Sequence, residues 1–201
     1  MKPISARKIA ITAMFIALLL VCALTPIGFF PIIPGVIDAA FVFLVVITVA
    51  LQVEGFWTGF ICATAFGVFS CVKAWLYPVN VTAFMFQNPI VSVLPRIALA
   101  LTGYFSFVLI KKMTKQSKSK FMRMRLPSII SAAITVVTNT GLVVLAMSLG
   151  YGGELLNAEL GTVMQYISST ILVFIFPIEL CANMLITPVL CTALKKYAKR
   201  R

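Results

Sequence analysis

Six long apolar stretches constrain this chain more than any other feature of its sequence. They lie at about 8–25, 36–52, 55–76, 90–110, 127–149 and 164–194. A stretch of about twenty apolar residues crosses a bilayer as a helix. Apolar residues make up 61% of the chain and charged residues 11%, whereas soluble proteins have about 25% charged residues. We therefore expect an all-α, polytopic membrane protein in which residues 1–201 form one domain, a bundle of six transmembrane helices.

The connections between these stretches are short or rich in helix-breaking residues. The segment 26–35 contains too much proline and glycine to remain helical, which predicts a short apolar loop. Residues 77–89 form a longer connection, of the kind that is often functional. Asp38 falls at the predicted start of the second helix, where the helix dipole favours a carboxylate.

The basic residues predict the orientation of the bundle. Fifteen of the 17 lie in three segments: the N-terminus, the connection at about 111–126 and the C-terminus. Because basic residues accumulate in cytoplasmic segments, both termini and this basic loop should face the cytoplasm. The net charge of +12 is then a topology signal, so we expect the lipid bilayer as a partner and no nucleic acid.

Composition also limits the chemistry that the chain can perform. There is no histidine and there are only five acidic residues, which excludes histidine-based acid–base catalysis and histidine-ligated metal sites. No glycine-rich phosphate-binding motif occurs. We expect no enzyme activity, no cofactor and no metal, and another chain must supply the energy for any uphill work. An intramembrane hydrolase with Glu179 as its base is an alternative, but the sequence offers it no second catalytic carboxylate at matching depth.

Charged side chains within the predicted spans are the main functional candidates, because such burial is costly unless a partner or a wet cavity is present. Arg96 lies in the fourth stretch, Glu179 in the sixth, and Lys73 near the outer end of the third. One hypothesis is an Arg96–Glu179 ion pair that holds two helices together. The other is a solute site that uses Arg96.

Uncharged polar residues at membrane depth add further candidates. Asn139 and Asn183 could each bond to a neighbouring backbone, which is the usual role of a single membrane amide. Ser92 lies four residues before Arg96 on the same predicted helix face, and Asn139 shares a face with serine and threonine residues, so we expect a cavity between the two faces. Trp75 fits either an aromatic belt or the cover of an outer pocket.

The first apolar stretch carries small residues at helical spacing. Ala10, Ala13 and Ala17 recur three or four residues apart, which makes a smooth stripe where another helix can approach closely.

Three segments of the chain resemble the substrate-binding S component of energy-coupling factor (ECF) vitamin transporters. They are the basic N-terminus that leads into Ala13–Leu18, the proline-rich segment Pro26–Pro34, and Phe86–Ile97, which runs from an Asn-Pro to a Pro-Arg pair. The resemblance extends over essentially the whole chain and is greatest to pantothenate-type S components. It implies a bacterial cell-membrane protein that binds a water-soluble vitamin near the outer face, under the first and third loops.

The same resemblance implies partners and site residues. The partners are a transmembrane T subunit, which docks on the Ala13-x-x-x-Ala17 motif, and two cytosolic ATPases. A toppling of the S subunit would carry the vitamin inward. Pantothenate needs a cation for its carboxylate and several amide or hydroxyl partners. The candidate substrate-binding residues are Arg96, Asn88, Gln87, Asn139, Ser92, Lys73, Trp75 and Asn183. Alternatives are an S component for hydroxymethylpyrimidine, pyridoxine or riboflavin, or a purely structural membrane subunit.

Overall fold

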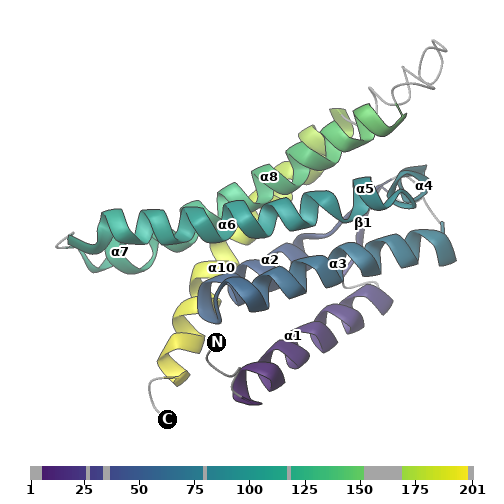
Figure 1. The fold of residues 1–201 in the computed structure, drawn as a ribbon. Helices are drawn as coiled ribbons and strands as arrows, with labels where there is room; N and C mark the ends of the chain where they lie inside the picture. The colour runs from purple at the N-terminus through teal and green to yellow at the C-terminus, as the bar shows by residue number, and fades with distance from the viewer. Residues whose placement is uncertain are drawn as a thin grey trace.

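Long apolar helices dominate the computed structural model, which describes residues 6–25, 28–33, 37–78, 81–116, 119–151 and 169–198 (Figure 1). Five helical segments are long and apolar enough to cross a membrane: Ala6–Leu24, Phe56–Leu76, Pro89–Gln116, Leu126–Leu149 and Ile171–Lys196. A sixth apolar helix, α2 (Phe41–Val53), has 13 residues. At 1.5 Å per residue it extends about 20 Å, which is shorter than a hydrocarbon core of about 30 Å.

A short antiparallel hairpin precedes α2 and corrects two predictions. It pairs β1 (Phe30–Ile33) with β2 (Ile37–Ala39), and Pro31 lies opposite Asp38. Residues 37–39 therefore do not open a helix, and Asp38 lies in a strand instead of at a helix start. Part of the predicted loop at 26–35 is strand as well, while residues 26–27 and 34–36 lie outside the described residues.

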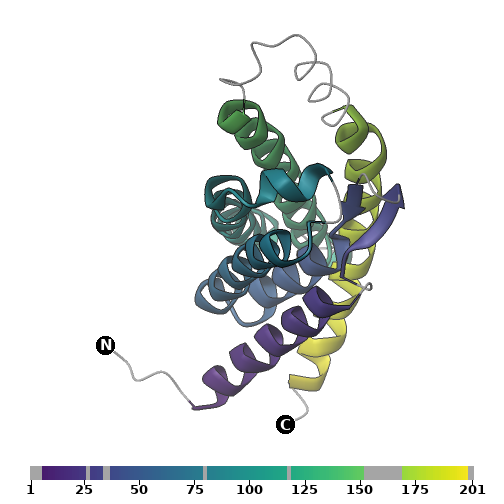
Figure 2. The ribbon, with the colours of Figure 1, turned by 90° about the vertical axis from the view of Figure 1, so that its right-hand side faces the viewer.

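The first and third apolar helices follow the predicted ranges closely. These are α1 (Ala6–Leu24) and α3 (Phe56–Leu76), and α1 packs against α3 and α2 at the edge of the bundle (Figure 2). Between α2 and α3 the chain turns at Gly55, whose φ of 99° is favourable only for glycine. The turn keeps α2 and α3 side by side.

The connection at 77–89 and the fourth predicted helix form three helical pieces. They are α4 (Val81–Phe86), α5 (Pro89–Ser92) and α6 (Leu94–Met113). The expected basic loop at 111–126 is mostly helical too, because α6 reaches Met113 and is followed by η1 (Thr114–Gln116) and α7 (Lys120–Met124). Residues 117–118 lie outside the described residues.

The last two apolar stretches form α8 (Leu126–Tyr151) and, after η2 (Ile171–Ile175), α10 (Phe176–Ala198). Pro188 lies inside α10, where proline removes a backbone hydrogen bond and bends a helix. Residues 164–168 of the predicted sixth helix lie outside the described residues.

The bundle has two distinct ends. We call the end with β1, α4 and α5 the hairpin end, and the opposite end with α7 the basic end (Figure 1). Helix α1 begins and α10 ends on the side of α7. The segments richest in lysine and arginine therefore gather at one end of the molecule.

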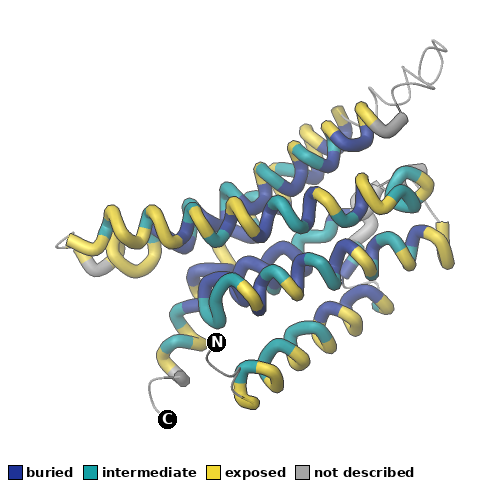
Figure 3. Tube along the Cα trace, in the orientation of Figure 1, coloured by how far each residue is buried: buried dark blue, intermediate teal, exposed yellow. Residues whose placement is uncertain are grey.

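The core lies between α1, α2, α3, α6 and α8 and is apolar. Phe43 on α2 stacks on Phe66 of α3 with ring centroids 4.4 Å apart, and both side chains are fully buried. Helix α2 is buried along most of its length, whereas α1 exposes much of its surface (Figure 3). The short α2 is therefore the central helix of the bundle.

We expect Gly59→Ala to destabilise the bundle by about 1–3 kcal/mol, the usual cost of overpacking. A Cβ at Gly59 would lie 2.9 Å from the Cα of Leu51 on α2, and closer still to its side chain. Gly141 on α8 is the matched control, because a Cβ there meets no atom within 4 Å and alanine favours the helix. Thermal unfolding of both variants in detergent tests this. Equal melting temperatures would contradict the close α2–α3 contact.

Candidate functional site

Arg96 lies in the first turn of α6, where two proline-containing helix starts follow one another. Asn88 caps α5 by accepting a hydrogen bond from the Ile90 amide at 3.0 Å, and Pro89 follows at the first helical position. Pro95 then occupies the start of α6. Two successive helix starts within Phe86–Ile97 thus position Arg96 at the beginning of α6. Asn88, a candidate binding residue, has a capping role here.

The Arg96 side chain is buried, with 3% of its surface exposed. Its Nη1 donates to the carbonyl of Val91 at 3.1 Å, and its guanidinium carbon lies 5.0 Å from the ring centroids of both Phe66 and Phe86. These contacts are within the range of cation–π attraction. Its Nε has no hydrogen-bond partner among the described residues. The buried guanidinium therefore has one N–H donor without an acceptor.

Glu179 on α10 is the buried acid of the same region, with 4% of its surface exposed. Its Oε1 accepts a hydrogen bond from the Ala40 amide at 3.0 Å, and its Oε2 accepts one from Thr140 at 3.4 Å. Ala40 is the N-cap of α2 and offers no side-chain cap of its own. Glu179 therefore supplies the hydrogen-bond acceptor for the backbone amide at the start of α2, where the helix dipole favours a negative charge.

Arg96 and Glu179 attract each other through space, but the described side chains form no ion pair. Both oxygens of Glu179 are used by α2 and α8 instead. Arg96 therefore has no carboxylate in direct contact among the described side chains.

Asn139 and Asn183 differ in how their amides are used. Asn183 is fully buried, donates to Thr48 and to the carbonyl of Ala132 at 3.3 Å each, and accepts a bond from Thr187. Asn139 on α8 is buried as well, with 6% exposed, but its Oδ1 has no partner among the described residues. Asn139 therefore has the second buried polar atom without a hydrogen-bond partner among the described residues.

The remaining candidates form a brace at the hairpin end. The Trp75 indole donates to the Gln87 carbonyl, and the Gln87 amide donates to the Ala74 carbonyl, both at 3.1 Å. The Lys73 ammonium lies 3.7 Å from the ring centroid of Phe29, and Trp75 is 66% exposed. These bonds tie the end of α3 to the α4–α5 turn and leave Trp75 at the surface.

The Ser92 hydroxyl already has a hydrogen-bond partner and supports the packing of the helices. It is buried and donates to the Gly67 carbonyl on α3 at 2.9 Å. A Cβ at Gly67 would lie 3.0 Å from the Cα of Val93. The close approach of α3 to the α5–α6 junction therefore depends on both residues.

Sequence reasoning missed a polar stripe that runs along α10 at four-residue spacing. Each member has a partner on a neighbouring helix or within the stripe: Cys191 contacts Gln52 of α2, and Gln52 bonds to Ser128 of α8. The stripe residues are Glu179, Asn183, Thr187, Cys191 and Lys195.

Phe66 and Phe86, which flank Arg96, were also missed, because the sequence does not distinguish a phenylalanine of the core from one that contacts a cation.

A comparison with protein-family models finds no match to this chain, and a comparison with curated protein sequences finds none.

Proposed function

We propose that this chain is a multi-pass membrane protein of six spans that binds a small carboxylate-bearing solute at Arg96, as the substrate-binding S component of an ECF-type vitamin transporter. The observation that carries the proposal is the unused Nε of a buried arginine. A buried charge without full hydrogen bonding is costly, and functional sites are where such costs persist. A carboxylate ligand would supply the missing acceptor.

The second unused polar atom bears on the ligand class. A ligand that also reaches the Oδ1 of Asn139, which has no partner among the described residues, would carry a hydroxyl or amide N–H besides its carboxylate. Pantothenate carries all three groups, which makes it our first choice of vitamin. Hydroxymethylpyrimidine and pyridoxine carry hydroxyl groups but no carboxylate, and they would leave Arg96 unpaired.

Orientation follows from the ends of the bundle. The hairpin end, with Arg96 nearby, would face outward, and the basic end with both termini would face the cytoplasm. The vitamin would then enter beside the hairpin and the Trp75–Gln87 brace. Because the sequence has no nucleotide motif, a T subunit and two ATPases would supply the energy.

Ligand identification tests the proposal. Protein purified in mild detergent should retain its ligand, and mass spectrometry of the extracted ligand should identify pantothenate. Calorimetric titration of the emptied protein with pantothenate should show binding without partner subunits. Recovery of pyridoxine, hydroxymethylpyrimidine or riboflavin, none of which has a carboxylate, would keep the S-component proposal but refute a carboxylate site at Arg96. Absence of binding by all four compounds would refute the proposal.

The stripe on α1 leads to a prediction about the T subunit. Ala10, Ala13 and Ala17 are all exposed, at a spacing that puts them on one side of α1. Ala13→Trp should reduce co-purification with the T subunit by about tenfold or more, because a large side chain on a small-residue face separates helices. Pantothenate affinity should be unchanged. Val137→Trp on the exposed side of α8 is the control, and equal co-purification of both variants would contradict docking at α1.

A further inference from the structure

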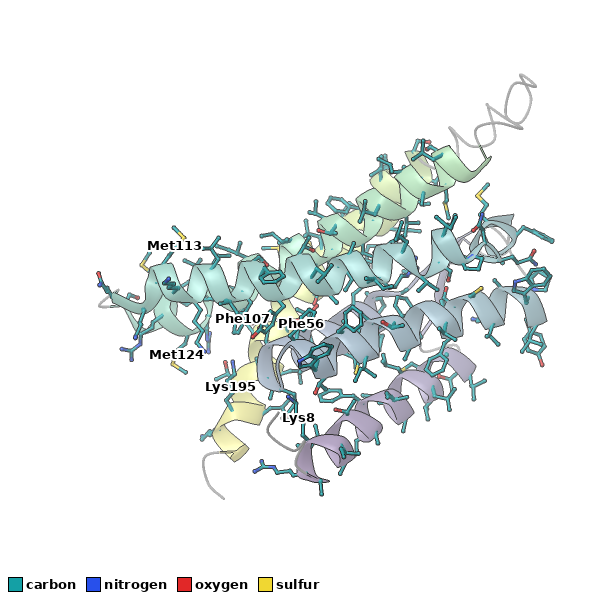
Figure 4. The ribbon with its side chains drawn as sticks, in the orientation of Figure 1. Lys8, Phe56, Phe107, Met113, Met124 and Lys195 are labelled. Atoms are coloured by element: carbon teal, nitrogen blue, oxygen red, sulfur yellow. The ribbon has the colours of Figure 1, made fainter. Side chains whose placement is uncertain are left out.

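Two lysines from different helices meet at one aromatic ring at the basic end. The Lys111 ammonium on α6 lies 5.6 Å from the ring centroid of Phe107, and the Lys195 ammonium on α10 lies 5.2 Å from it. Phe107 is buried, with 8% exposed, while Lys195 is half-buried and Lys111 exposed. Figure 4 shows Phe107 and Lys195 on neighbouring helices at this end. Both ammonium groups therefore share Phe107 as an aromatic partner, within the range of cation–π attraction.

The two positive charges lack a counter-charge. They are close enough to repel each other, and neither forms an ion pair with a described residue. No acidic residue occurs in the sequence between Glu54 and Glu154 or after Glu179, so α6, η1, α7 and the last turns of α10 contain none. An anion placed between the two ammonium groups would relieve their repulsion.

The surroundings of the pair mix exposed apolar and basic side chains. Met113, Phe121 and Met124 are 74%, 51% and 48% exposed, and Met113 and Met124 lie near the end of α6 and in α7 (Figure 4). Exposed basic residues alternate with them: Lys112, Lys115, Arg123 and Arg125. Such a mixture is typical of a segment at the level of lipid headgroups, where apolar side chains enter the acyl region and basic ones meet phosphates.

We propose that Lys111 and Lys195, which share the Phe107 ring, bind the phosphate of one anionic phospholipid headgroup, with the acyl chains along the exposed apolar side of α6. The proposal rests on the membrane placement given above, but not on the identity of the vitamin. A free phosphate would account for the lysine pair alone, whereas a phospholipid also accounts for the exposed Phe121, Met113 and Met124. The bound lipid would fix α6 and α10 to the inner leaflet.

Native mass spectrometry tests the site in the whole protein. Purified protein is titrated with phosphatidylglycerol and, separately, with phosphatidylcholine. Wild type should bind phosphatidylglycerol more tightly. K111Q/K195Q should lose about 5- to 30-fold in affinity for it, since each basic residue near an anionic surface contributes about fivefold, and its affinity for phosphatidylcholine should not change. K111R/K195R, which keeps both charges, should retain the preference.

K112Q/K115Q is the matched control, because it removes two exposed charges from the same segment. Its affinity for phosphatidylglycerol should fall by less than about threefold, because distant exposed charges are screened. Equal losses in the two double variants would overturn a defined site. Binding of inorganic phosphate that depends on Lys111 and Lys195, without a preference for phosphatidylglycerol over phosphatidylcholine, would overturn a phospholipid as the occupant. Pantothenate titration of the same samples separates the two proposals: lipid preference without vitamin binding would refute the S-component proposal alone.

Discussion

Arg96→Ala should weaken pantothenate binding by tens to thousands of fold. Removing the cation would leave the ligand carboxylate desolvated without its partner, a loss of about 2–5 kcal/mol by analogy with buried charge pairs. The guanidinium lies 5.0 Å from the ring centroids of Phe66 and Phe86, and its Nε has no partner among the described residues, so the ligand carboxylate would be its hydrogen-bond acceptor. Calorimetric titration in detergent measures the change.

Two further variants separate a specific contact from a loss of charge. Arg96→Lys should recover only part of the affinity, because an ammonium cannot reproduce the planar, bidentate guanidinium. Arg123→Ala removes the same charge from the exposed α7 and should bind as wild type does. Near-normal affinity in a well-folded Arg96→Ala protein would exclude Arg96 from the ligand site.

The double variant Arg96→Met with Glu179→Leu addresses the ion-pair hypothesis. If Arg96 served only to neutralise Glu179, the double change would restore folding and binding together. The structure predicts that it will not, because both Glu179 oxygens bond to Ala40 and Thr140 rather than to Arg96. A stable double variant with normal affinity would show that the two charges only compensate each other.

Apolar runs were sufficient to predict the five long apolar helices among the described residues, since the length of an apolar stretch is a local property of the sequence. The predicted start of the last one, at residue 164, lies outside the described residues. The start of α2 was not predictable in this way. Residues 37–39 are followed directly by an apolar helix, and only their pairing with Phe30–Ile33 separates them from it. Strand pairing depends on a partner segment, and one apolar stretch does not specify it.

The site was predictable to a similar degree. Arg96 and Glu179 were identified because charges are rare at membrane depth, and both are indeed buried. Their partners were not identifiable: Asp38 was expected at the start of α2, but the carboxylate that occupies that place comes from α10, 139 residues along the chain from Ala40. Likewise, only tertiary contacts show that Asn183 is fully bonded while Asn139 is not.

Glu179→Leu should destabilise the protein by about 2–5 kcal/mol, the range for removing one partner from a buried charged hydrogen bond. The variant would leave the Ala40 amide and the Thr140 hydroxyl buried without an acceptor, and Arg96 without a nearby negative charge. Helix α2 is buried along most of its length and begins directly after the hairpin. Its first amides therefore depend on protein acceptors, because lipid offers none.

Glu179→Gln should cost less than Glu179→Leu, since the amide oxygen can still accept from Ala40 although the charge opposite Arg96 is lost. Glu54→Leu is the control, because Glu54 is a half-exposed acid at the other end of α2 and its loss should change stability little. Thermal unfolding of the three variants in the same detergent, each without ligand, gives the order. If Glu179→Leu unfolds at the wild-type temperature but fails to bind pantothenate, Glu179 belongs to the ligand site and another group must satisfy the start of α2.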